Sequence, residues 1–379
     1  MASTDRFVWL DALRLTAGAS MIALHASADS MGRPFVDHPV SERIAPMLLR
    51  AVIYIARTEL FIIIALFLLL MALDRRPRGY GRVIGEQARR LLVPFAFWTV
   101  FYAFYNLIKA NAFGFEHAIW AQISDPAAWV EFFLLGNVKY HMHFIPTLFG
   151  VVLAYPLYRA AVERPALGLL VVAALFMRRE LDGFVYSTFW GEEALSWLVR
   201  LVKIASYVGY GMVAGALLGL FRRTTPEMRE SLVPPLLFAG GLLFLGKLAA
   251  TWLTVTKGEW PHGFLAGYWA DYLMPVALFA ICMCLAHRRW PDWISRLAPY
   301  SFGIYLCHPI FLDLVEIGLR GTDFTPIWQM LIKIGFAFAG TALLVVVLRR
   351  IGLLAWTIGL GPLPKLLPSF RSPSKSETA

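Results

Sequence analysis

Residues 9–29 read Trp9-Leu-Asp-Ala-Leu-Arg14-Leu-Thr-Ala-Gly-Ala-Ser-Met-Ile-Ala-Leu-His25-Ala-Ser-Ala-Asp29, an apolar run as long as a membrane span that still carries ionisable side chains. Arg14 and His25 lie eleven positions apart, so on a helix they share one face, about 16 Å apart along the axis. Burying such groups in a membrane is costly, and residues kept there are typical of functional sites. The pair therefore predicts both a membrane helix and a site.

The composition indicates a polytopic all-α membrane protein. Of 379 residues, 59% are hydrophobic and 16% are charged, and long apolar runs alternate with short basic loops. The net charge of +10 lies mainly in the loops, which favours membrane topology and anionic membrane lipid over nucleic acid as its explanation. The cysteines lie inside apolar segments, so we expect core residues rather than disulfides or a metal site (Cys282, Cys284 and Cys307).

We predict ten transmembrane helices in one domain over residues 1–350, followed by an interfacial or disordered cytoplasmic tail at 351–379. The fifth is short, and could be tilted, extended into Arg178 and Arg179, or re-entrant. The loop at 109–141 is expected to lie along the membrane surface. The predicted spans are 9–28, 47–73, 91–108, 142–160, 165–177, 197–221, 232–255, 267–286, 298–318 and 327–348.

Basic residues set the predicted orientation. Lys and Arg are concentrated in the tails and in the loops on the same side as the N-terminus, above all in residues 75–90. The positive-inside rule then places both termini in the cytoplasm. In this orientation Arg14 lies toward the cytoplasmic leaflet and His25 toward the opposite leaflet.

The acidic neighbours of the pair allow two interpretations. Asp29 follows His25 by four positions and could hold one ring nitrogen, leaving the other free as a base. Asp11 precedes Arg14 by three positions and could simply neutralise it. A buried Arg or His could also do no more than bridge neighbouring helices.

Three further segments carry candidate residues. The basic pairs Arg75/Arg78 and Arg89/Arg90 match phosphate oxygens in geometry, although topology alone also explains them. Residues 139–146 contain His141 and His143, which are two positions apart and so do not share a helical face. This spacing disfavours a pair of zinc ligands on a helix. The segment could instead form the rim of a site for an acceptor substrate, or an ordinary belt of aromatic residues at the membrane interface. Residues 300–311 contain Tyr305, His308 and Pro309. The proline removes a backbone hydrogen bond of the helix. For His308, a hydrogen bond to a neighbouring helix is the favoured role. Glu59 is a further ionisable residue near a span.

Taken together, these features resemble the acyltransferase 3 family of membrane O-acyltransferases that modify bacterial envelope glycans. The resemblance rests on the Arg-x10-His spacing of Arg14 and His25, the Arg-x-x-Arg of Arg75 and Arg78, and ten predicted spans. Further similar segments are residues 89–94, 140–146 and 305–309. The chain differs from the family at residues 60–67, where a Phe-Phe-x-x-Ser-Gly-Phe pattern is usual, and at His143, where Trp is usual.

The resemblance implies transfer of an acetyl or succinyl group from cytoplasmic acyl-CoA to a hydroxyl of an extracytoplasmic glycan, glucan or lipid-linked sugar. Such polysaccharide modification, O-acetylation included, would take place at the bacterial inner membrane. His25 would be the general base and Asp29 its orienter, and Arg14 would contact the donor. The phosphates would be held by Arg75, Arg78, Arg89 and Arg90, and the acceptor-side or structural residues would be His141, His143, Tyr305, His308 and Glu59.

Two other functions are compatible with buried Arg and His. A secondary transporter or flippase of a glycan precursor would also use them, but it would usually show inverted repeats or paired broken helices, which we do not find. A sensor with an acyltransferase-like fold and no activity is the third possibility. Within the enzyme hypothesis, a covalent acyl-histidine intermediate stays open beside direct transfer.

Overall fold

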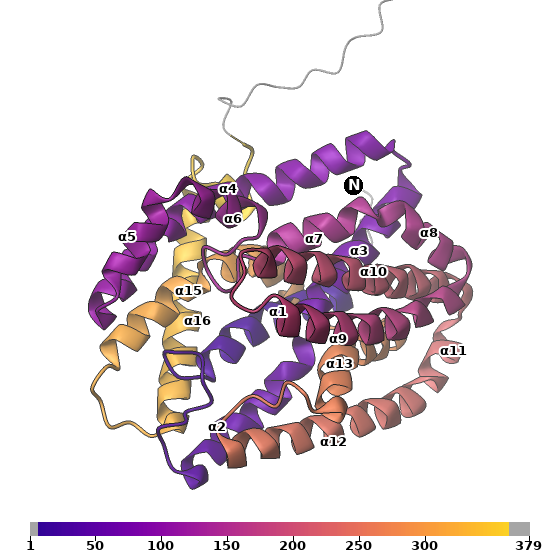
Figure 1. Cartoon of the computed structure of the whole chain (residues 1–379). Helices are drawn as coiled ribbons and strands as arrows, with labels where there is room; N and C mark the ends of the chain where they lie inside the picture. Colours follow the sequence, from indigo (N-terminus) through magenta and orange to yellow (C-terminus); the bar gives the residue numbers. More distant parts are fainter. Residues whose placement is uncertain (1–6, 364–379) are drawn as a thin grey trace, which may run out of the picture.

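The computed structural model describes residues 7–363, and in this part of the chain every regular element is a helix. Figure 1 shows α1 (Val8–Ala26) in the middle of a helical bundle. The protein is therefore all-α, as predicted. The other elements are α2 (Val40–Ile53), η1 (Tyr54–Ala56), α3 (Thr58–Arg75), α4 (Tyr80–Phe113), α5 (Glu116–Ser124), α6 (Pro126–Leu134), α7 (Phe144–Leu153), α8 (Tyr155–Glu163), η2 (Pro165–Leu169), α9 (Leu170–Thr188), α10 (Ala194–Arg223), α11 (Pro226–Ser231), α12 (Val233–Lys257), α13 (Leu265–Cys284), α14 (Trp293–Leu297), η3 (Ala298–Tyr300), α15 (Ser301–Gly318), α16 (Pro326–Arg350) and η4 (Ala355–Ile358).

Within the described residues, seven helices are long and apolar enough to cross a membrane, and the pair α7 and α8, bent by 62°, makes an eighth if it is one span. The chain is thus a multi-pass membrane protein. Asp11, Arg14 and His25 lower the hydropathy of α1, and α9 carries four charged residues, so neither meets the same criterion. The count of ten and the cytoplasmic termini stay predictions.

The structure contradicts one predicted boundary and decides one that the sequence left open, both at positions that matter for the site. The predicted second span, 47–73, is broken: α2 ends at Ile53, Arg57 is extended with ψ at −179°, and α3 begins at Thr58. The fifth segment continues past Arg178 and Arg179 to the end of α9, which is one of the three forms it was expected to take.

The segment that follows α16 packs against α4. Ile358 of η4 is fully buried, and Trp98 Nε1 on α4 donates to the Thr357 carbonyl at 2.8 Å. The predicted tail at 351–379 thus includes the packed element η4, and residues 364–379 lie outside the described residues. The loop predicted at 109–141 contains α5 and α6, which both contact α4.

A row of glycines brings α10 close to α8. Gly211, Gly215 and Gly219 are spaced by four residues and so share one helical face. A Cβ atom at Gly211 would overlap the Tyr158 ring, one at Gly215 the Tyr158 carbonyl oxygen, and one at Gly219 the Val162 carbonyl oxygen. Small residues at such a spacing allow two membrane helices to approach each other's backbones.

This contact predicts that Gly215→Ala lowers the midpoint of thermal unfolding in detergent. The added methyl group meets main-chain atoms, and overpacking of this kind costs about 1–3 kcal/mol. Gly241→Ala on α12 is the matched control, because nothing lies within 4 Å of the Cβ position there. Equal midpoints for the two variants would show that α8 moves aside freely.

Candidate active site

Three imidazoles from distant parts of the sequence meet at one end of α1. The His25 ring on α1 stacks on the His308 ring of α15, with centroids 5.6 Å apart and an interplanar angle of 22°. His141, just before α7, lies 5.2 Å from His308, and Tyr140 lies 4.3 Å from His25. The Tyr305 hydroxyl donates to the His141 carbonyl and so fixes this segment to α15. The structure therefore brings together His25, His141, His308 and Tyr305; we call the three histidines the imidazole cluster.

The His308-Pro309 dipeptide fixes the tautomer of His308. Proline has no N–H, so the carbonyl of Tyr305, four residues earlier, loses its usual helical donor. His308 Nδ1 lies 2.8 Å from this carbonyl oxygen, which can only accept, so Nδ1–H is the donor. Neutral His308 then has its free lone pair on Nε2, which is buried with no partner among the described residues. The predicted interhelical hydrogen bond of His308 is wrong, because its partner lies within α15.

A cavity of about 80 Å³ adjoins the cluster. His25 Nε2, both ring nitrogens of His141 and Nδ1 of His143 are buried without hydrogen-bond partners among the described residues. Buried polar atoms are nearly always paired, so this group marks a place for ligand atoms or water. The cavity is lined by Met21, Leu24, His25, Tyr54, Arg57, Thr58, Tyr140, His141, His143 and Phe144.

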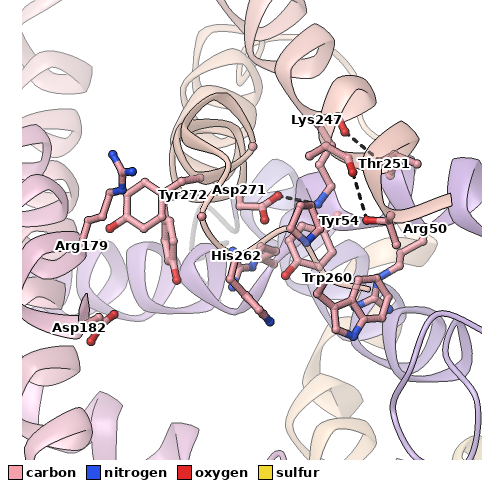
Figure 2. Close-up of a pocket in the computed structure, with 18 of the residues that line it drawn as sticks. Arg50, Tyr54, Arg179, Asp182, Lys247, Thr251, Trp260, His262, Asp271 and Tyr272 are labelled. Carbon is pink, nitrogen blue, oxygen red and sulfur yellow. Dashed lines mark hydrogen bonds and ion pairs between the residues drawn. The ribbon is translucent and has the colours of Figure 1, made fainter. Parts of the chain in front are cut away.

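A larger cavity of about 1030 Å³ lies between α2, α9, α12 and α13 (Figure 2). Tyr54 and Arg57, at the break between α2 and α3, line both this cavity and the small one. The two cavities are therefore neighbours across these two side chains.

Asp29 is not beside His25. Helix α1 ends at Ala26, so the expected helical spacing of four residues does not apply. The Asp29 carboxylate instead accepts from the backbone N–H groups of Met31 and Arg33, at 2.9 and 2.8 Å, and from Arg33 Nε at 2.9 Å. It also raises the pKa of Arg33, by its charge first and then by the hydrogen bond. The predicted role of Asp29 as orienter of His25 is therefore wrong.

Arg14 lies near the other end of α1. Its Nη1 is 3.6 Å from Asp11 Oδ1, and Asp11 accepts from Ser295 Oγ at 2.8 Å. This is the neutralising pair that the sequence allowed. A contact of Arg14 with a donor molecule stays a prediction.

The predicted phosphate-binding arginines lie at the same end as Arg14. Helix α3 runs antiparallel to α1: Thr58 contacts Met21, whereas the Arg75 guanidinium lies 5.8 Å from the Phe7 ring. Arg78 forms an ion pair with Glu86. Arg89 and Arg90 are exposed further along α4, about 15 Å from the start of that helix.

The sequence identifies Glu59 as an ionisable residue near a span, but it does not predict the pairing of Glu59 with Arg57. Glu59 is fully buried; its Oε2 lies 3.3 Å from Arg57 Nε, and its Oε1 accepts from the Tyr207 hydroxyl at 2.5 Å. Arg57 also lies over the rings of Tyr54 and Tyr272, at 4.6 and 4.8 Å. No glycine or proline marks the break that places Arg57 here; the available signal is Thr58-Glu59, an acidic first turn.

Comparison with known families decides the classification. The acyltransferase 3 family model, described as an acyltransferase domain, matches residues 7–350. The chain belongs to the acyltransferase 3 family. Membership supports acyltransferase activity in general and agrees with the multi-pass membrane architecture. Comparisons with curated proteins and with solved structures found no match.

In this acyltransferase 3 family member, the described residues include no group of three or more His, Cys, Asp or Glu side chains arranged to hold a metal ion. The cysteines are free thiols, and Cys284 and Cys307 are buried, as expected of core residues, whereas Cys282 is partly exposed.

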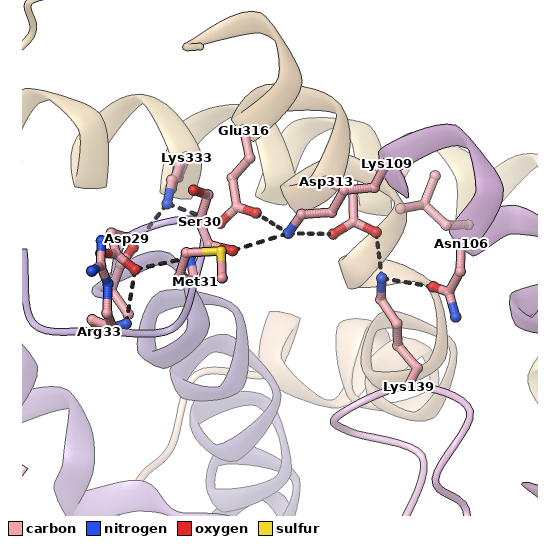
Figure 3. Close-up of polar contacts among 12 residues, drawn as sticks. Asp29, Ser30, Met31, Arg33, Asn106, Lys109, Lys139, Asp313, Glu316 and Lys333 are labelled. Carbon is pink, nitrogen blue, oxygen red and sulfur yellow. Dashed lines mark hydrogen bonds and ion pairs between the residues drawn. The ribbon is translucent and has the colours of Figure 1, made fainter. Parts of the chain in front are cut away.

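A chain of buried ion pairs braces the cluster in this family member (Figure 3). It connects α4, α15, α16 and the segment before α7. Asp313 and Glu316 on α15 are the two acids, and three lysines alternate with them. The nitrogen-to-oxygen distances are 2.6 Å for Lys139–Asp313, 3.3 Å for Lys109–Asp313, 2.5 Å for Lys109–Glu316 and 2.9 Å for Lys333–Glu316.

Both ends of this ion-pair chain hold elements of the site. Lys139 immediately precedes Tyr140 and His141, so its pairing with α15 holds their segment against that helix. Lys333 also donates to the Ala28 carbonyl at 2.8 Å, three residues after His25. The ion pairs thus position two members of the imidazole cluster from outside it.

Asp313→Asn is therefore expected to destabilise the fold strongly. It leaves Lys139 and part of Lys109 without a counter-charge, and removing one partner of a buried pair costs about 3–5 kcal/mol. Thermal unfolding in detergent would be compared with Asp292→Asn, an exposed aspartate before α14. If Lys139→Gln in the Asp313→Asn background restored none of the lost stability, the unpaired charge would not be the cause.

Proposed function

We propose that the protein is an inner-membrane O-acyltransferase. It moves an acyl group, acetyl or succinyl, from cytoplasmic acyl-CoA to a hydroxyl of an extracytoplasmic glycan or lipid-linked sugar. The observation that carries this proposal is His25 Nε2, which is buried without a hydrogen-bond partner among the described residues, in a small cavity that borders a large one. A free imidazole nitrogen facing a cavity of this kind is what a general base requires.

The proposed reaction is direct transfer. His25 Nε2 accepts the proton of the acceptor hydroxyl while the hydroxyl oxygen attacks the thioester carbonyl carbon. The tetrahedral intermediate then expels the CoA thiolate, which takes up the proton and leaves as the thiol. The new ester stays on the glycan. No other co-reactant is needed.

Arg57 is the candidate for stabilising the oxyanion of this intermediate. Of the residues that line the small cavity, it is the one that carries a permanent positive charge. Its Nε contacts Glu59 at 3.3 Å, and this pairing supports a fixed orientation of the guanidinium. A preorganised donor of this kind stabilises negative charge as it develops.

The donor would approach from the opposite end of the bundle. In the predicted orientation, Arg14, Arg75, Arg78, Arg89 and Arg90 face the cytoplasm. Guanidinium groups there would bind the phosphates of CoA, with the pantetheine arm extending along the bundle toward His25. The roughly 16 Å between Arg14 and His25 along α1 is the gap this arm would span.

His25→Ala is expected to lower acyl transfer by at least about 100-fold, the lower end of what a general base contributes. Membranes carrying the variant would be assayed for thiol release from acetyl-CoA and succinyl-CoA, and cell-envelope glycans would be compared by mass spectrometry for one acyl unit. His117→Ala on α5, an exposed histidine, is the control. Retained acylation at normal protein abundance would remove His25 from the catalytic role. Movement of labelled glycan without consumption of acyl-CoA would indicate a transporter instead.

Replacing Arg75 and Arg78 together by alanine is expected to weaken acyl-CoA binding about tenfold or more, since two phosphate contacts are lost. Binding to purified protein would be measured by titration calorimetry. The matched control is Arg288→Ala with Arg289→Ala, which removes two charges from another loop predicted to be cytoplasmic. Unchanged affinity in the first pair would mean that its charges serve topology alone.

A further inference from the structure

The large cavity has the size of a ligand site and no role in the reaction described so far. Its volume of about 1030 Å³ is at the upper end of small-molecule sites. It is walled by α2, η1, α9, α12, α13 and the segment at 260–263. At the border with the small cavity stand Tyr54 and Arg57, so a ligand filling the large cavity would reach the vicinity of His25.

The lining carries an excess of positive charge. Five lining residues are Arg or Lys and two are Asp, an excess of three, or two when Glu59 beside Arg57 is counted. Lys247 pairs with Asp271 at 2.6 Å, and Arg178 Nε pairs with Asp182 at 3.1 Å. Figure 2 shows Asp182 and Lys247 on opposite sides of the cavity.

Arg50 is held in place by neutral groups. Its Nη1 donates to the Leu24 carbonyl and to Ser27 Oγ, both at 2.6 Å. The guanidinium also lies over the Trp260 ring at 4.4 Å and the Tyr54 ring at 5.4 Å. None of these contacts cancels its charge, so Arg50 presents a fixed cation at the cavity.

Two buried atoms on α9 lack partners among the described residues. They are Arg178 Nη1 and Asp182 Oδ1, and both residues line the cavity. Arg178 is only 8% exposed, so leaving one of its donors unused is costly. A ligand that brings an anionic oxygen to Arg178 and a hydroxyl to Asp182 would satisfy both atoms. Arg179, the next residue, adds a further cation at the same wall.

The uncharged part of the lining is rich in tyrosine and tryptophan. These side chains present an apolar ring face together with a polar tip, which suits a ligand with one apolar and one hydroxylated surface, such as a sugar ring. Trp190 is 75% exposed and Trp260 is half-buried, which places aromatic rings where a chain-like ligand would leave the cavity. The aromatic lining residues are Tyr54, Tyr186, Trp190, Trp260, Tyr268 and Tyr272.

We propose that the large cavity binds the acceptor, and that the acceptor is an anionic glycan. Its phosphate or carboxylate substituent is held at the α9 wall by Arg179 and by Arg178 Nη1, which has no partner among the described residues, and Arg50 adds positive charge from the other side of the cavity. A hydroxyl of a neighbouring unit passes Tyr54 and Arg57 to His25. This inference rests on the proposed acyltransferase function. A neutral glycan would leave the excess charge of the lining uncompensated, which is unfavourable in a partly buried site.

The test compares binding of matched neutral and charged probes to the purified full-length protein in detergent. The probes are maltotetraose, maltotetraose carrying one 6-phosphate, and a tetrasaccharide ending in glucuronate, titrated by calorimetry. Both charged probes should bind at least about tenfold more tightly than maltotetraose, and their advantage should shrink as salt is raised. The two charged probes also tell phosphate from carboxylate.

The variants Arg50→Gln and Arg179→Gln should each reduce the advantage of the charged probes over maltotetraose, measured on the same variant, to less than about threefold. Arg159→Gln, an exposed arginine on α8 away from the cavity, should leave it unchanged. Arg50 also fixes the end of α1, so Arg179→Gln decides the matter if Arg50→Gln does not fold. Equal binding of neutral and charged probes, or no binding of the charged ones, would overturn the proposal. So would CoA binding that Arg179→Gln abolishes, because the cavity would then be the donor site.

Failure of the acceptor proposal and failure of the proposed function give different results. Thiol release from acetyl-CoA or succinyl-CoA is measured with the same probes. Equal release with neutral and charged tetrasaccharides would contradict charge selection while supporting the enzyme. Charge-selective binding without any thiol release would keep the anion site and contradict the acyltransferase role.

Discussion

The chain of alternating charges through Asp313 and Glu316 is the constraint on which the site depends. In an apolar bundle an isolated charge is very costly, so three lysines and two carboxylates can be buried together only if each faces an opposite charge. These pairs come from α4, α15, α16 and the segment before α7. The same interactions that make the charges tolerable therefore fix where those elements meet, and they meet around the imidazole cluster.

Local sequence patterns were sufficient to predict the membrane helices and to single out the histidines of the imidazole cluster. The helical spacing of Arg14 and His25, the apolar spans and the motif around His308 follow from local patterns, and the resemblance they support agrees with the family match. What failed was the assignment of partners. Asp29 was expected beside His25 because a helix was assumed to continue, but the chain turns after Ala26 and the carboxylate is used by Arg33.

Partners that lie far apart in the chain could not be predicted from one sequence. Lys139 and Asp313 are separated by 174 positions, and Glu59 and Tyr207 by 148. The break at 54–57 is equally hidden, since it contains neither glycine nor proline. Yet this break creates the border between the two cavities, and so the most informative part of the site is the part with the weakest local signal.

The His308-Pro309 dipeptide has an effect beyond the shape of α15. Proline contributes no group that could react, but the amide it lacks decides which nitrogen of the neighbouring ring carries hydrogen. The tautomer of neutral His308 is therefore set by the main chain. This tautomer does not depend on a second side chain, because the partner of Nδ1 is a main-chain carbonyl. Substitutions of the side chains around the ring would therefore leave Nε2 as the nitrogen that accepts a proton.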